Sequence, residues 1–302
     1  SAAEDTDAGM EQRAGLLLNS LNSVGDSSGG TNTLCVSHRL NQQNDIGGRF
    51  GNMLFQYAAG LGTARAFRLE FLHAYHWLYL PFDGVPTPEL ECSDDAVLLP
   101  EDKAMVFDAE WQQQIEAGAK NRYALLGYRQ SWRYFEGSEG VLRAQFRFSA
   151  YYRSKAQRFL AQIESEQSTG KPIVFVGVHV RAGDLLQVPL VGSSAQHVYG
   201  TGGFFRKAHD FFVAKYNDST VVFVVCSNQP DFASSLWSFS SSTVAVPIDV
   251  SDGSMFVDMA TLVECNHSII SWGSYGWWAA WLGGGDGGCC PELMGARGGC
   301  GP

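Results

Sequence analysis

The second half of the sequence alternates short, wholly apolar runs with stretches whose apolar residues recur at helical spacing. Residues 173–176 and 221–225 are the clearest apolar runs, and such runs are typical of strands that are covered on both faces. Residues 202–216, between them, place several phenylalanines on one helical face. Strands and helices that alternate at this spacing predict a doubly wound parallel sheet, and hence a Rossmann-like nucleotide-binding domain.

The same pattern continues toward the carboxyl end of the chain. Strands are expected at 243–246 and 268–270, and helices around 231–237, 255–263 and 275–282. In the first half, residues 34–36 predict a short strand, and "GGRFGNMLFQYAAGLGTARAF" (47–67) predicts glycines that lead into a helix. Residues 70–160 are rich in aromatic residues and have weak periodicity, so the sequence predicts little there.

The glycine-rich start of the 47–67 segment is not a standard phosphate loop. It lacks the Lys-Ser/Thr ending of a P-loop and the full G-x-G-x-x-G of a dinucleotide fingerprint. Arg49 and Asn52 are placed where they could face a ligand, but a structural tight turn explains the glycines equally well.

Three polar residues appear abruptly at the end of a predicted buried strand. The stretch "VGVHVRAGD" (176–184) contains His179, Arg181 and Asp184. Ligands of open parallel sheets collect beyond the carboxyl ends of the strands, and the planar fork of an arginine fits a phosphate through two hydrogen bonds. Alternatively, Arg181 and Asp184 pair with each other and cap a loop.

A second candidate anion site follows the strand expected at 268–270. In "SWGSYGWWAAWLGGGD" (271–286), Ser274 stands at an expected N-cap, next to the backbone amides of Tyr275 and Gly276 and the positive end of a helix dipole. Plain N-capping above a core of tryptophans is the alternative. Two anion-holding groups at one edge of a sheet predict a diphosphate ligand.

Composition restricts the partners and the chemistry. The 302 residues carry a formal net charge of -10, so no general cationic surface for nucleic acid is expected. The seven cysteines lack paired C-x-x-C spacing, so no structural zinc site is expected, and Cys226 and Cys265 are assigned to the core.

Asn-x-Ser triplets at Asn217 and Asn266 hint at a secretory route. No stretch has the length of a membrane span, although a start at Ser1 is compatible with a removed upstream anchor.

Four segments together resemble the galactoside 2-α-L-fucosyltransferases, within the fucosyltransferases that carry an H-x-R-R-x-D motif. They are "GGRFGNMLFQYA", "VGVHVRAGDLLQV", "VFVVCSNQP" and "DMATLVECNHSIISWGSYGWWAAWLGGGD". The resemblance implies an α/β glycosyltransferase of the GT-B type, with two Rossmann-like domains and the donor site in the carboxyl-terminal one. It also implies inverting transfer of L-fucose from GDP-fucose to the 2-hydroxyl of a terminal β-galactoside on a glycan, with no metal or other cofactor.

The family's usual setting, the Golgi lumen with a single amino-terminal anchor, is implied as well. The expected divisions are a flexible leader (1–32), an acceptor-side domain (33–165), a GDP-fucose domain (166–286) and a Gly- and Cys-rich tail (287–302). The sequence leaves the oligomeric state open.

The site residues follow from both the pattern and the resemblance. Arg181, Ser274 and the helix amides are expected to stabilise the departing GDP. The general base is His179 or Asp184, unless either of them orients Arg181 instead. Asn228 and Asp258, in matching segments, are expected to contact the nucleotide or its ribose, with core or capping hydrogen bonds as the alternative.

Two departures from the family pattern leave other functions open. Ala182 stands where the family motif has a second arginine, and the tail after Asp286 has few residues suited to a strand or a helix. The alternatives are therefore a fucosyltransferase with a different acceptor or linkage, and a non-catalytic relative that binds a GDP-sugar or a glycan.

Overall fold

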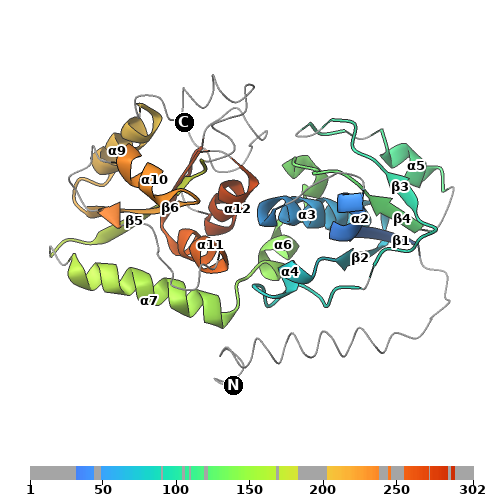
Figure 1. The fold of residues 1–302 in the computed structure, drawn as a ribbon, viewed down its shortest axis with the longest axis horizontal. Coiled ribbons are helices and arrows are strands. Elements are labelled where there is room, and N and C mark those ends of the chain that lie inside the picture. The colour runs from blue at the N-terminus through green and yellow to red at the C-terminus, as the bar shows by residue number, and fades with distance from the viewer. Residues whose placement is uncertain are drawn as a thin grey trace. The chain divides into compact units, whose positions relative to one another are not determined.

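The chain contains two compact units, each built around a parallel sheet (Figure 1). The computed structural model describes residues 32–43, 49–89, 91–103, 106–108, 110–118, 122–167, 170–182, 203–237, 244–245, 255–271, 273–284 and 287–289. Contacts within the chain group Ser1–Tyr151 as unit 1 and Tyr152–Pro302 as unit 2. The predicted leader lies outside the described residues, apart from Asn32.

Unit 1 has a four-stranded parallel sheet in the order β2-β1-β4-β3. Its strands are β1 (Thr33–Ser37), β2 (Glu70–Ala74), β3 (Val97–Leu99) and β4 (Arg122–Leu125). The strand expected at 34–36 is confirmed as β1. The other three strands lie in the region where the sequence pattern was weak. They are short and have one face or end half-exposed, so they do not form the long apolar runs that identify buried strands.

The helix predicted within 47–67 is confirmed as α3 (Phe50–Phe67), the main helix of unit 1. It packs closely on the sheet: a Cβ added to Gly60 would lie 2.7 Å from Cγ1 of Val36 and 2.6 Å from the ring of Phe71. The helix is buried on nearly every side, and its small residues allow this close approach.

The remaining helices of unit 1 are short. They are α2 (His38–Gln43), α4 (His76–Tyr79), α5 (Gln112–Glu116), the 3-10 helix η1 (Trp132–Phe135) and α6 (Glu139–Gln145). Helix α7 (Ala150–Glu166) connects the units. No helix in the described part of the chain combines the length and the apolar character that a membrane crossing requires.

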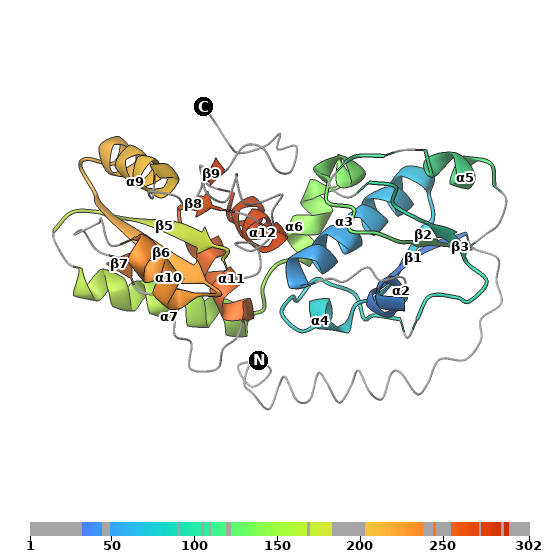
Figure 2. The ribbon, with the colours of Figure 1, turned by 45° about the horizontal axis from the view of Figure 1, so that its top comes forward.

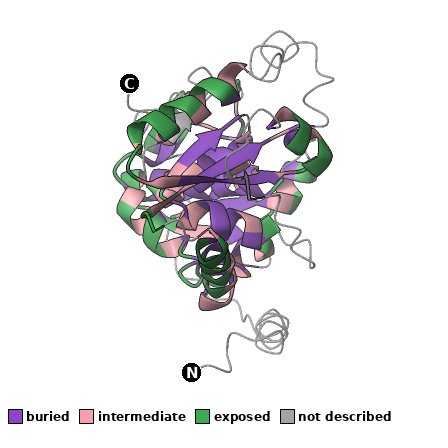
Figure 3. Cartoon of the chain, turned by 90° about the vertical axis from the view of Figure 1, so that its left-hand side faces the viewer, coloured by how far each residue is buried: buried purple, intermediate pink, exposed green. Residues whose placement is uncertain are grey.

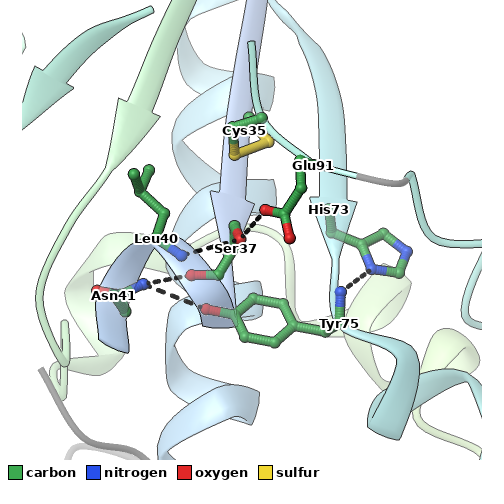
Figure 4. The surroundings of a disulfide bond; sticks show 8 residues. Cys35, Ser37, Leu40, Asn41, His73, Tyr75 and Glu91 are labelled. Atoms are coloured by element: carbon green, nitrogen blue, oxygen red, sulfur yellow. Dashed lines mark hydrogen bonds between the residues drawn. A yellow bond between two sulfur atoms is a disulfide. The ribbon is translucent and has the colours of Figure 1, made fainter. Parts of the chain in front are cut away.

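A disulfide bond joins an inner strand of unit 1 to the segment before β3. Cys35 of β1 is bonded to Cys92, with 5.6 Å between their Cα atoms. Next to it, the hydroxyl of Ser37 donates to the carboxylate of Glu91 at 2.8 Å (Figure 4). The disulfide and this hydrogen bond together fix the irregular segment before β3 against the sheet.

Unit 2 contains the doubly wound sheet that the sequence predicts. Its order is β7-β6-β5-β8-β9, and all pairs are parallel. The strands are β5 (Ile173–Val180), β6 (Thr220–Ser227), β7 (Val244–Ala245), β8 (His267–Ile270) and β9 (Gly287–Cys289). The first strand lies in the middle, and later strands are added first on one side and then on the other (Figure 2).

Both faces of this sheet are buried, as the apolar runs predict (Figure 3). Alternate residues of β5 and β6 point to opposite faces. On one face they form a core with Phe205, Phe212 and Trp237. On the other face, Val222 and Val224 pack with residues of α7 and with Cys265. The core assignment of Cys226 and Cys265 is confirmed, because both are free and buried.

The helices of unit 2 agree with the predicted positions. They are α9 (Gly203–Lys215), α10 (Pro230–Leu236), α11 (Met255–Glu264) and α12 (Ser274–Gly283). The division between the units falls after Tyr151, in the first turn of α7, whereas the sequence predicted it after residue 165. The physical reason is that Leu160 and Ile163 of α7 pack into the core of unit 2.

The expected Gly- and Cys-rich tail needs one correction, because its first three residues form a strand. Gly287, Gly288 and Cys289 pair in parallel with Ser268–Ile270 of β8. Backbone groups make these hydrogen bonds, so an edge strand can form here despite the low strand propensity of glycine. Residues 290–302 lie outside the described residues.

We predict that the disulfide contributes substantially to the stability of unit 1. The bond joins residues 57 positions apart, and closing a loop of this size typically stabilises a domain by about 2–5 kcal/mol. Reduction should therefore lower the urea concentration at which unit 1 unfolds. The Cys35→Ala/Cys92→Ala variant should unfold at the lower concentration with or without reductant. Equal stability of the oxidised and reduced wild type would contradict this prediction.

Candidate functional site

The strand order of unit 2 defines where a ligand is expected. The order reverses between β5 and β8, since the chain moves from β5 outward to β6 and β7 and then returns to β8. Ligands of doubly wound sheets bind outside the carboxyl ends of the strands at such a switch point. Arg181 directly follows β5, and Ser271 directly follows β8. We call the residues that follow β5, β6 and β8, with the first turn of α12, the carboxyl edge of unit 2.

The segments after β5 and β8 are joined by two hydrogen bonds. The backbone N–H of Ser271 donates to the carbonyl oxygen of His179 at 3.1 Å. The backbone N–H of Arg181 donates to Oγ of Ser271 at 2.9 Å. Ser271 therefore continues the pairing of the two strands and holds the backbone of Arg181 at the switch point. Ser271 was not among the predicted site residues, although its place directly after a strand is the same signal that identified Arg181.

Asn228 holds the next residue of the same loop. Its Oδ1 accepts from the backbone N–H of Ala182 at 3.0 Å, and its Nδ2 donates to the Ala182 carbonyl oxygen at 3.3 Å. One amide side chain thus satisfies both backbone groups of Ala182, whose side chain is fully buried. Asn228 therefore makes hydrogen bonds within the fold, and its predicted contact with a nucleotide stays a prediction.

The start of α12 differs by one residue from the predicted helix. The N-cap is Gly273, and Ser274 is the first helical residue, with a buried side chain. Gly273 has φ 94° and ψ 152°, a backbone conformation that is essentially restricted to glycine. This conformation, rather than a serine cap, turns the chain from β8 into the helix.

Arg181 lies beside this helix start. A Cβ on Gly273 would be 3.8 Å from Cγ of Arg181, so the aliphatic part of the arginine passes the N-cap of α12. Its guanidinium is half-buried, and Nη1 donates to the carbonyl oxygen of Ala182 at 3.3 Å. The edge therefore brings together a permanent cation and the positive end of a helix dipole. Both favour an anion.

His179 is buried below this edge rather than exposed on it. Its side chain is 6% exposed, and its ring lies 5.2 Å from the ring of Tyr275. Burial, with a smaller effect from the Arg181 charge, lowers the pKa of His179 to about 4. The imidazole is therefore neutral near pH 7, and this position suits packing better than proton transfer.

Gly276 provides the space that His179 occupies. A Cβ on Gly276 would be 2.5 Å from Nδ1 of the histidine. Any larger residue at this position would push β5 and α12 apart. Gly276 was predicted as a site residue for its backbone amide, and the structure adds that its missing side chain lets the histidine and the helix start pack together.

Tyr275 and Asp258 connect α12 to α11. The Tyr275 hydroxyl donates to the backbone carbonyl of Met255. Asp258 is half-buried in the first turn of α11. Burial is the main cause that raises the pKa of Tyr275, and the nearby Asp258 carboxylate raises it further. The carboxylate acts in the same direction on the pKa of the Cys226 thiol.

The predicted site residues thus gather around one edge of unit 2. Arg181, Asn228 and the first turn of α12 lie at the carboxyl ends of the strands, while His179 supports them from below. Asp258 approaches the same region from α11. Asp184 lies outside the described residues.

In unit 1, polar residues that follow the carboxyl ends of the strands form a buried hydrogen-bond network. Asn41 donates to the Ser37 carbonyl oxygen (Figure 4). Its Oδ1 accepts from the Gly127 N–H at 3.0 Å. Gln56 of α3 donates to the Gly127 carbonyl oxygen at 2.9 Å and accepts from the Tyr75 hydroxyl at 2.7 Å. The network ties α3 to three strand ends and so fixes where its amino end lies.

The two candidate residues at the start of α3 have different surroundings. Arg49 is the exposed N-cap of the helix. Asn52 accepts at its Oδ1 from Nε2 of Gln130 at 2.8 Å. Asn52 therefore links α3 to the chain after β4. Gly47 and Gly48, on which the tight-turn interpretation depends, lie outside the described residues.

The fold defines an α/β protein with a doubly wound sheet in unit 2, and the carboxyl edge of that sheet is a candidate anion site at its switch point. The sequence model of glycosyl transferase family 11 matches residues 37–289, and the chain belongs to this family.

Curated relatives are galactoside alpha-(1,2)-fucosyltransferases. Galactoside alpha-(1,2)-fucosyltransferase 1 of Ateles belzebuth is 34% identical over 242 residues, and that of Homo sapiens is 33% identical over 245 residues. Each match covers 79% of this chain and 64% of the relative. The chain therefore spans just under two thirds of the length of these relatives.

Solved structures show a similar fold at low sequence identity. A variant of Arabidopsis thaliana FUT1 in complex with GDP aligns with a TM-score of 0.57 and 12% identity. The alignment covers 93% of this chain and 74% of the FUT1 chain. The alpha-1,6-fucosyltransferase NodZ, co-crystallized with GDP, aligns with a TM-score of 0.50 and 14% identity. This alignment covers 82% of this chain and 91% of the NodZ chain. These similarities establish the fold.

We predict that Gly276→Ala destabilises unit 2 and weakens anion binding at its carboxyl edge. The added Cβ would overlap the His179 ring, and overpacking of this kind typically costs about 1–3 kcal/mol. Urea unfolding and GDP titration would measure the two effects. Gly140→Ala is a suitable control, because a Cβ there meets nothing within 4 Å.

A double variant identifies the cause. If the clash with the imidazole is responsible, Gly276→Ala should cost less stability in a His179→Ala background than in the wild type. Additive effects of the two substitutions would show that the histidine and the glycine are not coupled.

We also predict a stability change with pH that depends on His179. The folded protein binds a proton at His179 with a pKa of about 4, below the ordinary value of 6.5. The unfolded chain therefore takes up this proton first, and stability falls as the pH drops from about 6.5 toward 4.

The His179→Gln variant should lose less stability between about pH 7 and pH 5, by up to roughly 1.4 kcal/mol per pH unit. Burial also lowers the pKa of His73 to about 4. His73 therefore adds to the loss of stability at low pH, and this part of the loss should persist in the His179→Gln variant. Equal slopes of unfolding free energy against pH in the wild type and His179→Gln would contradict the prediction.

Proposed function

We propose that this protein transfers L-fucose from GDP-fucose to the 2-hydroxyl of a terminal β-galactoside on a glycan, with inversion at the anomeric carbon. The observation that carries the proposal is the joint placement of Arg181 and the amino end of α12 at the switch point of unit 2. Membership of glycosyl transferase family 11 and the names of the relatives support the donor, the acceptor and the linkage.

The proposed architecture is that of a GT-B glycosyltransferase, with two Rossmann-like domains and the donor held by unit 2. The parallel sheet in each unit supports this assignment. The similar folds solved with GDP support a guanine nucleotide as the ligand of such a fold. Unit 1 then contributes to binding of the acceptor glycan.

The residues of the carboxyl edge explain how the transfer would be accelerated. As the bond between fucose and GDP breaks, negative charge develops on the diphosphate. The Arg181 guanidinium and the N–H groups of the first turn of α12 stabilise that charge, because they are already oriented when the reaction begins. In metal-dependent transferases a divalent cation stabilises the charge on the diphosphate. Here the fixed donors do so, and the proposed reaction therefore proceeds without a metal ion.

The other residues of the edge are assigned supporting tasks. Ser271 and Asn228 hold the backbone of Arg181 and Ala182. Tyr275 contributes a backbone amide, while its hydroxyl is bonded to Met255. Asp258 contributes negative charge next to the nucleotide region and is assigned to the nucleoside part of the donor.

The acceptor hydroxyl needs a general base, and we assign this role to Asp184 rather than His179. A carboxylate is ionised near pH 7 and can accept the proton of the attacking hydroxyl. His179 is buried, and its lowered pKa makes it a weak base. We therefore propose that His179 orients Arg181.

We place the reaction in the Golgi lumen, with the full-length protein held by an amino-terminal membrane anchor. The Cys35–Cys92 disulfide supports a secretory location, because disulfides persist in oxidising compartments and are rare in the cytosol.

A non-catalytic relative that binds GDP-fucose is the second candidate, and Ala182 is the observation that favours it. The side chain at this position is fully buried, and Asn228 holds both of its backbone groups. The position therefore contributes no second cation to the edge.

The test is release of GDP from GDP-fucose with and without a β-galactoside acceptor, in the presence of a metal chelator. Acceptor-dependent release, with a product linked α at the galactose 2-hydroxyl by NMR, is the expected result. GDP binding without acceptor-dependent release, across a panel of glycans, would favour the non-catalytic relative. A product linked at another position would identify a different fucosyltransferase.

We predict that Arg181→Ala lowers kcat by roughly 10²–10³-fold, the usual cost of removing one donor from a developing oxyanion. Arg181→Lys should recover part of the activity, since lysine keeps the charge but loses the planar fork. Arg158→Ala is the matched control, because Arg158 is exposed on α7 in the same unit. Wild-type kcat in Arg181→Ala would exclude the proposed role of this arginine.

A further inference from the structure

Unit 2 carries two Asn-x-Ser triplets. Both lie at the amino ends of its strands, and the proposed donor site lies at the carboxyl ends. Asn217-Asp218-Ser219 stands between α9 and β6, and Asn266 directly precedes β8. Each triplet therefore begins just before the amino end of a strand. In a parallel sheet the amino and carboxyl ends of the strands lie at opposite edges. Both asparagines therefore lie at the opposite end of the sheet from Arg181 and the amino end of α12.

Asn217 has the surroundings of a surface attachment point. Asn217 and Asp218 are exposed, in a turn that is closed by a hydrogen bond from the Ser219 N–H to the Tyr216 carbonyl oxygen at 3.0 Å. The next N–H, that of Thr220, donates to the Pro172 carbonyl oxygen at 2.8 Å. The Asn217 side chain makes no hydrogen bond to a described residue. A bulky substituent on it would displace no contact of the described fold.

Asn266 is in a different position, because its carboxamide is part of the fold. Its Oδ1 accepts from the backbone N–H of Phe175 at 2.8 Å, and its backbone N–H donates to the Phe175 carbonyl oxygen at 2.9 Å. The serine of its triplet, Ser268, is buried within β8. Asn266 thus has a structural task that explains its presence without a modification, whereas the described contacts give Asn217 none.

We infer that Asn217 is an acceptor for N-linked glycosylation. In this reaction Nδ2 of Asn217 attacks the anomeric carbon of an oligosaccharide carried on a lipid diphosphate. A nitrogen–carbon bond forms, the bond between that carbon and the diphosphate oxygen breaks, and the amide loses one proton as the lipid diphosphate leaves. The triplet supplies the required Ser at the second position after the asparagine, with a residue other than proline between them.

The compartment required for this modification agrees with an independent feature of the chain. The Cys35–Cys92 disulfide in unit 1 indicates folding in an oxidising environment, where N-linked glycans are also attached. Glycosylation of Asn217 requires that the protein enters the secretory pathway, but it does not depend on the proposed sugar-transfer activity. A large polar glycan at this edge would add to solubility without covering the donor site.

The test is to produce the full chain in eukaryotic cells behind a cleavable secretion signal, and to map occupied asparagines by mass spectrometry. Peptide N-glycosidase treatment in heavy-oxygen water marks each formerly occupied asparagine as a labelled aspartate. We expect label at Asn217. Wild-type protein with an unlabelled Asn217, whether Asn266 is labelled or not, would overturn the inference.

Matched variants separate the triplet from the asparagine itself. Both Asn217→Gln and Ser219→Ala should abolish the label at position 217 and lower the intact mass by one glycan, while Ser219→Thr should retain it. Asn266→Gln should leave occupancy at Asn217 unchanged. Asn217→Gln should also bind GDP as the wild type does, so a failure of the proposed transfer activity would be distinguishable from a failure of this inference.

Discussion

Burial of β5 on both faces is the constraint on which the rest of unit 2 depends. Strands covered on both faces are typical of parallel sheets, in which helices lie above and below the strands. These conditions account for β6 and β8 as neighbours, for α9 and α10 over one face, and for α7 and α11 over the other. They also place the switch point of the sheet at the carboxyl end of β5. Arg181 is the first residue beyond that end.

The carboxyl edge depends on a few contacts that keep a cation and a helix start together. Ser271 holds the backbone of Arg181, and Gly273 turns the chain into α12. Below them, Gly276 leaves room for the neutral His179 ring. Burial of the imidazole is tolerable because it is uncharged. The same low-dielectric surroundings would strengthen the attraction between Arg181 and a bound diphosphate.

The sequence alone predicted the elements of unit 2 because their apolar residues follow simple periods. Residues 221–225 identified β6, and the phenylalanines of 202–216 identified α9. The strands of unit 1 beyond β1 were not predicted, because β2, β3 and β4 are short and only partly buried. Strand β9 was missed for a related reason. It consists of glycine and cysteine, and its pairing depends on the edge that β8 offers.

The candidate site was predicted in outline but not in its contacts. The position of Arg181 after a buried strand identified it as a ligand residue, and the switch point in the structure supports that choice. The roles of the surrounding residues depend on contacts across the sheet. His179 was a candidate base by residue type, and only its burial against Tyr275 favours a positioning role. Asn228 was a candidate ligand residue by its position after a strand, and only the structure shows its bonds to Ala182.

The sequence by itself determined the fold class, the strand-end position of Arg181 and the resemblance that led to the family, because these depend on residue type and local spacing. Only the tertiary structure decided which residues hold Arg181 in place, where the two units divide, and which cysteines are bonded. Cys35 and Cys92 are far apart in the chain, as are Arg181 and Ser271. No local pattern records such pairs, because folding of the whole unit brings them within bonding distance.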